Sequence, residues 1–103
     1  MKYIMKVRMD TDKGNAALSD PEFGHKMSDL LAEIKAEAAY FSTIRGHRGA
    51  YIVINLNDAS EIPAVAEPFF MWLNAEIEFL PAMRPEDLQK AGPAIGAAVK
   101  KWG

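Results

Sequence analysis

The chain has 103 residues, of which half are hydrophobic and a quarter are charged, a composition that predicts one folded domain and excludes a disordered chain. With 12 Lys and Arg against 14 Asp and Glu, the formal net charge is −2, so no general attraction to nucleic acid is expected. The absence of cysteine excludes disulfides, thiolate catalysis and cysteine-based zinc sites.

The first residues predict a strand with one dry face. They include three cations and lack the apolar segment of a signal peptide, and the longest strongly apolar run in the chain, FFMWL, is too short to cross a bilayer. We therefore expect a soluble, cytoplasmic protein without a membrane partner. Residues 2–9 alternate between two faces, with Tyr3, Met5, Val7 and Met9 on one and Lys2, Ile4, Lys6 and Arg8 on the other.

A loop and a long helix are expected next. The polar, glycine-containing segment DTDKGNAALS predicts the loop. Ser19 or Asp20 is the predicted helix cap, with Pro21 in the first turn. The apolar residues that follow have helical spacing as far as residue 41: Phe23, Met27, Leu30, Leu31, Ile34, Ala38 and Phe41.

The segments FSTIR and AYIVINL predict a hairpin joined by GHRG, with Gly46 and Gly49 bracketing the turn. Two interpretations of this turn are open. Arg45 and Arg48 could bind an anion together with backbone amides, or they are solvated residues of a hairpin tip, which the turn chemistry favours. His47 has a side chain suited to acid–base chemistry, but no acidic residue stands near it in sequence to orient it.

The second half of the chain predicts a helix, a strand and a further helix. Asp58 or Ser60 is the expected cap of a short helix that Pro68 interrupts, followed by a second helical turn over PFFMWLN. The segment AEIEFL predicts a strand that ends at Pro81. A last helix begins at about Pro85 and is broken or kinked at residues 92–93.

The order β-α-β-β-α-β predicts an α+β, ferredoxin-like domain over residues 1–103, with a C-terminal helical extension over about residues 85–102. In this topology both helices cover the same face of a four-stranded antiparallel sheet, and the first strand lies between the third and the fourth. The other face is bare. A bare face of mixed apolar and charged character indicates a homodimer or a higher homo-oligomer that closes two sheets around a semi-polar interior.

The candidate ligand site is this bare face. Lys6 and Arg8 are expected opposite the glutamates of the last strand, and Trp72 and Phe70 are expected to close one end. Six residues form the predicted ligand-binding set: Lys6, Arg8, Tyr51, Trp72, Glu76 and Glu78. If they line a cavity, paired charges can separate the pKa values of the two carboxylates, as proton transfer requires. The alternative is an ion-paired dimer seam without a cavity, and the pairing of every charge favours it slightly.

Two metal-like patterns are weaker. His25, Asp29 and Glu33 have the spacing of ligands on one helical face, but that face lies opposite the apolar stripe and is expected to be solvated. The segment DTDKGN has its glycine one position early for a calcium loop and has no closing glutamate. We therefore expect no metal site and no cofactor.

Several short motifs carry a resemblance to a known family. VRMD ends the first strand, ND opens the second helix, PFF precedes the last strand, and EIEFLP forms it. These motifs, spread over most of residues 2–81, resemble those of muconolactone isomerase, a member of the dimeric α/β barrel group. The resemblance implies a ferredoxin-like subunit that dimerises and holds a ligand between helices and sheet or inside the barrel.

This group includes cofactor-free isomerases and oxygenases, as well as small proteins without an assigned role. The isomerase's acid and base find no matching positions here, so no catalytic residue is assigned. The extra C-terminal helix also differs from the shorter isomerase tail. Two functions follow as hypotheses: a small-molecule-binding protein or cofactor-independent enzyme of isomerase or monooxygenase type, or a structural subunit whose sheet face serves assembly.

Overall fold

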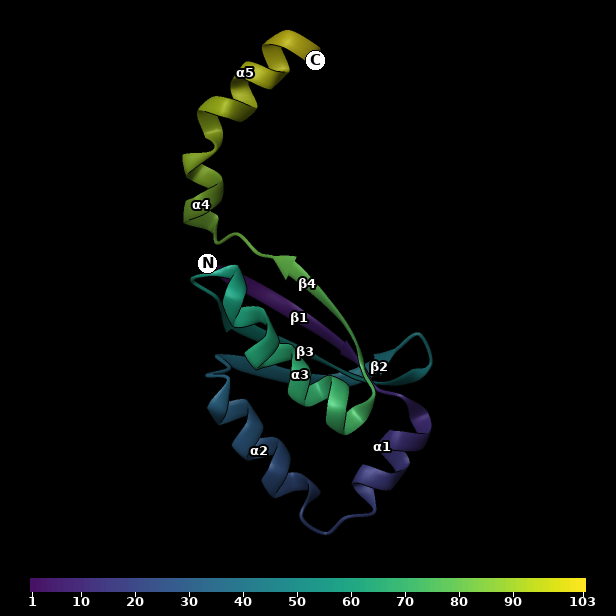
Figure 1. The fold of residues 1–103 in the computed structure, drawn as a ribbon. Helices are drawn as coiled ribbons and strands as arrows, with labels where there is room; N and C mark the ends of the chain where they lie inside the picture. Colours follow the sequence, from purple (N-terminus) through teal and green to yellow (C-terminus); the bar gives the residue numbers. More distant parts are fainter.

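The computed structural model describes all residues from 1 to 103. Four strands and five α-helices follow one another along the chain (Figure 1). Their bounds are β1 Lys2–Arg8, α1 Thr11–Leu18, α2 Phe23–Glu33, β2 Ala38–Ile44, β3 His47–Asn55, α3 Ile62–Leu73, β4 Glu76–Pro81, α4 Pro85–Lys90 and α5 Gly92–Trp102, with a 3-10 turn η1 at Ala59–Glu61 before α3.

The four strands form one antiparallel sheet in the order β2-β3-β1-β4. The prediction that the first strand lies between the third and the fourth is confirmed. Helices α2 and α3 lie on one face of the sheet (Figure 1). This α+β architecture, with its four-stranded antiparallel sheet, is compatible with a ferredoxin-like fold.

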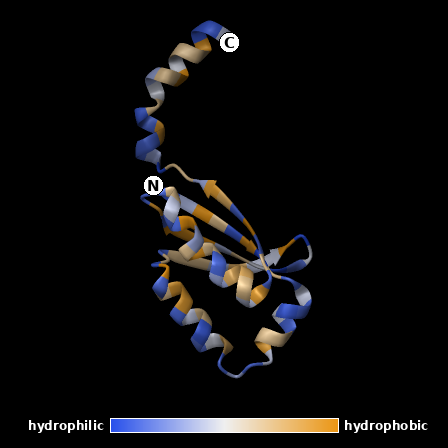
Figure 2. Cartoon of the chain, in the orientation of Figure 1, coloured by the Kyte–Doolittle hydropathy of each residue, from blue (hydrophilic) through white to orange (hydrophobic).

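The core lies between the sheet and these helices. Met5 and Val7 of β1 are fully buried, as are Ile52 and Ile54 of β3, which confirms the predicted dry face of the first strand. The core is completed from the helices, mainly by Met27, Leu30, Ile34, Val65, Phe69 and Leu73. Figure 2 shows hydrophobic residues along the strands, whereas the β2–β3 turn and the segment between α1 and α2 are hydrophilic.

The expected loop after the first strand is instead helix α1. Asp10 caps this helix, because its carboxylate accepts a hydrogen bond of 3.0 Å from the backbone amide of Lys13. Gly14, which favoured a loop in the sequence, is buried inside the helix, where an added Cβ would lie 3.1 Å from Nη1 of Arg48. Gly14 therefore lies within a helix, next to the side chain of Arg48, and not in a turn.

The first long helix is shorter than expected at both ends. Asp20 accepts a hydrogen bond from the amide of Glu22, but α2 begins only at Phe23 and ends at Glu33. Lys35 has a positive φ of 55°, and the chain then enters β2. Ala38 and Phe41, expected on the helix, are therefore strand residues.

The hairpin turn is also tighter than expected. Arg45 and Gly46 have φ of 47° and 79°, and Ile44 pairs directly with His47, which defines a two-residue turn. Gly49 lies inside β3 rather than at the turn. A Cβ at Gly49 would meet Cδ1 of Ile44 at 2.5 Å, so this glycine is required by packing across the sheet.

Helix α3 runs without interruption through Pro68, against the prediction of two short helices. A proline in a helix removes one backbone hydrogen bond, but the buried residues on both sides of it, among them Val65, Phe69 and Leu73, hold the helix against the sheet. Asp58 caps the preceding turn by accepting from the amide of Ser60, one of the two expected caps.

Residues 82–103 form a C-terminal arm that extends away from the body, residues 1–81 (Figure 1). A break in the last helix is confirmed, but it falls at Ala91 rather than at residues 92–93, because α4 ends at Lys90 and α5 begins at Gly92. The arm gives the chain dimensions of 57 × 28 × 21 Å and a radius of gyration of 17.2 Å. A compact chain of this length would have about 13 Å. Neither α4 nor α5 contains a buried residue.

Candidate functional site

The face of the sheet turned away from the helices, here called the uncovered face, carries four rows of residues, three of which cross all four strands. Residues paired across antiparallel strands share a face, so the register defines each row. The apolar row is Leu80, Ile4, Val53 and Ala38; the middle row is Glu78, Lys6, Tyr51 and Tyr40; the polar row is Glu76, Arg8, Gly49 and Ser42. The fourth row, Lys2 and Asn55, is polar and lies beyond the apolar row, so the apolar row runs between polar rows.

The predicted placement of the two cations opposite the two glutamates is confirmed. Arg8 forms an ion pair with Glu76, with 3.3 Å between Nη1 and Oε2. Lys6 pairs in register with both Glu78 and Tyr51, but its ammonium makes no ion pair within the chain. Only one of the two expected charge pairs is thus formed.

Trp72 and Phe70 do not close an end of the uncovered face, contrary to expectation. Trp72 belongs to α3, which covers the opposite face, and its ring packs on Phe23 of α2 with 5.3 Å between centroids. The reason is the continuity of α3 through Pro68, which places Trp72 one helical turn from the buried Phe69.

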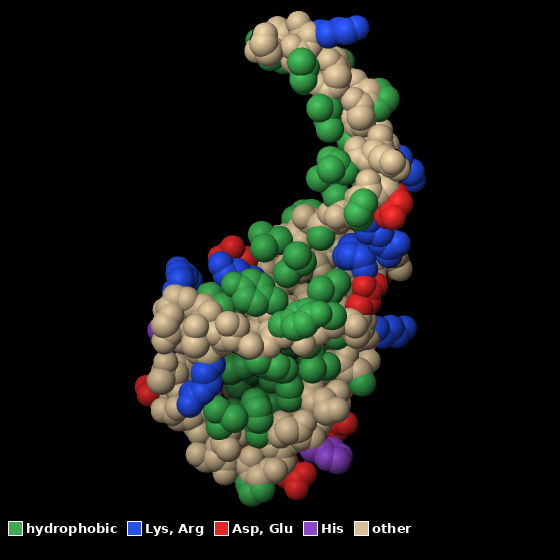
Figure 3. Space-filling view, turned by 180° about the vertical axis from the view of Figure 1, so that it is seen from behind, with side chains coloured by type: hydrophobic (Ala, Val, Ile, Leu, Met, Phe, Trp, Pro, Cys, Tyr) green, Lys and Arg blue, Asp and Glu red, His purple; other side chains and the backbone are tan.

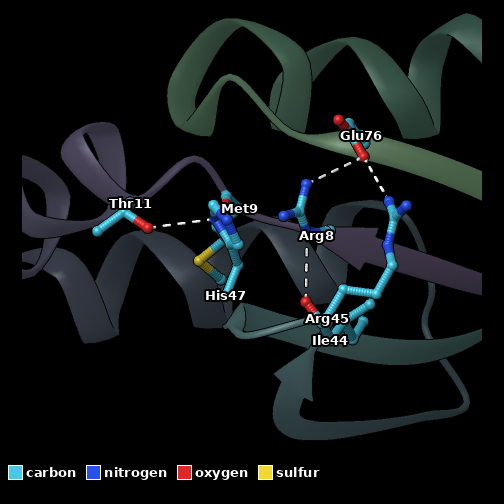
Figure 4. A network of polar contacts seen from close by, with 7 residues as sticks. All are labelled: Arg8, Met9, Thr11, Ile44, Arg45, His47 and Glu76. Carbon is cyan, nitrogen blue, oxygen red and sulfur yellow. Dashed lines mark hydrogen bonds and ion pairs between the residues drawn. The ribbon is translucent and has the colours of Figure 1, made fainter.

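Arg8 is the centre of a polar network at the end of β1 (Figure 4). Its Nε donates to the backbone carbonyl of Ile44 at 3.2 Å, while Arg45 donates to the same Glu76 oxygen that Arg8 contacts, at 2.7 Å. Two guanidinium groups therefore share one carboxylate. Within this network two positive charges face one negative charge.

His47 lies beside this network, oriented by groups far away in sequence. Its Nδ1 is 3.2 Å from the carbonyl oxygen of Met9 and 3.1 Å from Oγ1 of Thr11 (Figure 4). A carbonyl can only accept, so we assign the proton of the neutral ring to Nδ1. Nε2 then carries the free lone pair, and it makes no hydrogen bond within the chain. His47 is thereby prepared to act as a base at Nε2.

A cavity of about 240 Å³ joins the two features. It is lined by Arg8, Met9, Asp10, His47, Asn74, Ala75 and Glu76. Ligand pockets for drug-sized molecules span about 300–1,000 Å³, so this cavity suits a smaller molecule. Of the six predicted ligand-binding residues, Arg8 and Glu76 line it, whereas Lys6, Tyr51 and Glu78 lie farther along the uncovered face.

The two hairpin arginines do not form one anion cradle. Arg45 turns to Glu76, whereas Arg48 donates to the side-chain oxygen of Asn15 on α1 at 2.8 Å. The hairpin thus connects β4 with α1, and only one of its arginines contributes to the network around Arg8.

The remaining candidates are less equipped for chemistry. A cavity of about 440 Å³ at the opposite end of β3 is lined by Glu33, Lys35, Asn55, Glu61 and neighbouring residues, none of them histidine or arginine. There Glu61 already accepts from the amide of Asn57. His25, which was considered as a metal ligand, is exposed on α2, and the chain contains no group of three side chains arranged to hold a metal ion.

Four side chains at the surface of the body have shifted pKa values. Lys26 donates to Asp20, which lowers the pKa of Asp20 and raises that of Lys26. A hydrogen bond from Lys2 lowers the pKa of Glu37. A hydrogen bond from the backbone amide of Ser60 lowers the pKa of Asp58. These groups contribute to the surface rather than to the cavity.

Comparison of the chain with known protein families found no match, and comparison with curated proteins found none either. No helix has the length and apolar character needed to cross a membrane. The function must therefore be inferred from the arrangement of these residues.

Proposed function

We propose that the chain is a subunit of a homodimeric α/β barrel that binds a small carboxylic acid and transfers a proton on it without a cofactor. The observation that carries this proposal is the position of His47. His47 and Arg8 line the same cavity, and Nε2 of His47 makes no hydrogen bond within the chain. A base and an anion-binding group therefore border one cavity.

The division of labour follows from the chemistry of these side chains. The substrate carboxylate pairs with the guanidinium of Arg8, supported by Arg45. Nε2 of His47 removes a proton from a carbon next to a C=C bond of an unsaturated acid, the electron pair of the broken C–H bond shifts the double bond by one position, and the protonated Nε2 returns the proton to the carbon at the far end, which is the reaction of an isomerase. Because Nδ1 donates to the carbonyl of Met9, the ring keeps its orientation as Nε2 becomes protonated.

Dimerisation is supported by the uncovered face. Its apolar row crosses all four strands, and Leu80 and Tyr40 on this face are 42% and 67% exposed. Packing of this face against the same face of a second copy removes these side chains from water. The polar row then borders the interior, next to the cavity. This arrangement agrees with the resemblance to muconolactone isomerase.

The second candidate is a structural subunit without an active site. It is favoured by the ion pairs of Glu76, because Arg8 and Arg45 already have an anionic partner and need no ligand. In this case the polar row serves only to orient two copies.

Exchange of carbon-bound protons distinguishes the two. The protein is incubated in D2O with a panel of small mono- and dicarboxylates, and loss of proton signals is followed by NMR. We expect exchange with one or more acids, a rise in melting temperature with the same acids, and loss of exchange in His47→Asn. His25→Asn, which changes the exposed histidine, is the matched control and should retain the activity.

A panel that neither exchanges protons nor shifts the melting temperature supports the structural subunit instead. If His47→Asn unfolds, His47→Gln and the binding of the acids to Arg8→Gln test the same site. Retained exchange in a folded His47 variant would exclude this residue as the base.

A further inference from the structure

The C-terminal arm lacks a partner of its own. Five of its large apolar side chains are about half exposed or more: Met83 68%, Leu88 51%, Ile95 49%, Val99 63% and Trp102 80%. Helices α4 and α5 make their principal contacts only with each other. An isolated helix shorter than about 12–15 residues is marginal in water, and α5 has 11. A surface that packs against α5 would therefore stabilise it.

Helix α5 presents a defined apolar stripe. Ile95, Ala98, Val99 and Trp102 follow the i, i+3, i+4, i+7 spacing of one helical face. The neighbouring Ala97 lies on the opposite face. Figure 3 shows that most hydrophobic side chains visible on the arm line its concave side.

A matching surface lies on the body, between α2 and the edge strand β2. This groove, about 390 Å³ in volume, is lined by Phe23, Gly24, Met27, Ser28, Leu31 and Phe41. Phe41 is 56% exposed. Seen from behind, hydrophobic side chains line a hollow of the body (Figure 3).

Charge favours the same pairing. The arm carries four cations, Arg84, Lys90, Lys100 and Lys101, and two acids, Glu86 and Asp87, a formal charge of +2. The body carries eight cations and twelve acids, a formal charge of −4. Beside Trp102 the arm exposes two lysines, Lys100 and Lys101. Attraction between arm and body is therefore expected at physiological ionic strength.

We infer that the arm docks in the α2–β2 groove of a second copy of the chain, and the second copy returns the same contact. The arm leaves the body from β4, whereas the groove lies at β2, the other edge of the sheet. To reach its own groove, the arm would have to reverse at residues 82–84 and cross the sheet or α3. A reciprocal exchange between two copies needs no such reversal and closes with two-fold symmetry. The inference rests on the proposed homodimer but not on the site at His47.

Disulfide trapping tests this contact, because the chain has no cysteine of its own. Ser28→Cys marks the groove, Ala98→Cys marks the apolar stripe of α5, and Ala97→Cys is the matched control on the other face. One chain of each mixture carries a mass tag, and the mixtures are oxidised in a glutathione buffer. We expect the Ser28→Cys and Ala98→Cys chains to form a mixed dimer at least tenfold faster than the Ser28→Cys and Ala97→Cys chains.

The double variant Ser28→Cys/Ala98→Cys separates exchange from folding back. A disulfide formed within one chain, at the 11.4 kDa of the monomer, would overturn the inference. Equal rates for Ala97→Cys and Ala98→Cys in a chain that sediments as a dimer would overturn the arm contact and leave the proposed dimer standing. A monomer at all concentrations would overturn both.

Discussion

Substitution of Gly49 by alanine tests how closely the hairpin packs beneath the candidate site. An ideal Cβ at this position lies 2.5 Å from Cδ1 and 2.6 Å from Cγ1 of Ile44, and 2.9 Å from the carbonyl oxygen of Val7. Cβ atoms essentially never approach other heavy atoms so closely. Ile44 is only 3% exposed, and its backbone carbonyl accepts a hydrogen bond from Arg8. Neither Ile44 nor Val7 can therefore move away freely from an added methyl group.

The expected cost follows from overpacking. Inserting one methyl group into a closely packed site costs about 1–3 kcal/mol, and contact with a backbone oxygen places Gly49→Ala near 2 kcal/mol. Gly24→Ala is the matched control, because nothing lies within 4 Å of its ideal Cβ and it stands in helix α2. It should stabilise the chain by roughly 0.5–1 kcal/mol through its higher helix propensity.

Urea unfolding followed by circular dichroism measures both changes. Ile44→Ala removes the two closest atoms, so in the double variant with Gly49→Ala the two losses should be less than additive, while the Val7 oxygen prevents full recovery. A Gly49→Ala chain that unfolds at the same urea concentration as the parent chain, or at a higher one, would refute this account of the packing.

Three further results are expected. The hydrogen bond from Lys26 holds the pKa of Asp20 below 3.8, so this pair stabilises the fold above that pH. Its contribution to stability is lost as the pH falls through the lowered pKa. In Lys26→Met, NMR titration should show that the pKa of Asp20 rises. Pro68→Ala supplies the missing backbone donor of α3 and should increase the free energy of unfolding by about 1 kcal/mol; a lower midpoint of thermal melting would contradict this account of the helix. The Arg45→Ala and Arg48→Ala variants should each remain within about 0.5 kcal/mol of the parent chain, and a larger loss in urea would mean that the hairpin contacts are more than surface pairs.

The sequence predicted which strand residues face the core, because the alternation of side chains between the two faces of a strand is a local property. Met5 and Val7 alternate with Lys6 and Arg8, and topology then places the two cations opposite the glutamates of the last strand. The cavity at the end of β1 could not be predicted, because the groups orienting His47 come from a segment 36–38 residues away.

The helix boundaries depended on competition between local and long-range contacts. The alanine-rich segment before residue 40 favours helix, but the amide of Glu37 donates to the carbonyl of Val53 at 2.8 Å and begins the pairing of β2. At Pro68 the sequence predicted a break in the helix that does not occur, because burial of α3 outweighs the lost hydrogen bond. In the segment after β1, Asp10 is a residue type that favours a helix cap, but Gly14 favoured a loop, so helix α1 was not predicted.

The composition of the two sheet edges has a consequence for the handling of this protein. At one edge, β4 contains two glutamates and ends in proline, features that discourage further strand addition. At the other, β2 reads AAYFSTI, without a charge, a proline or a glycine. Such an edge is a template for aggregation when it is uncovered. If a second copy places its arm along the groove beside β2, assembly also protects the chain from self-association into fibres, and dilution or damage to the arm would expose that edge first.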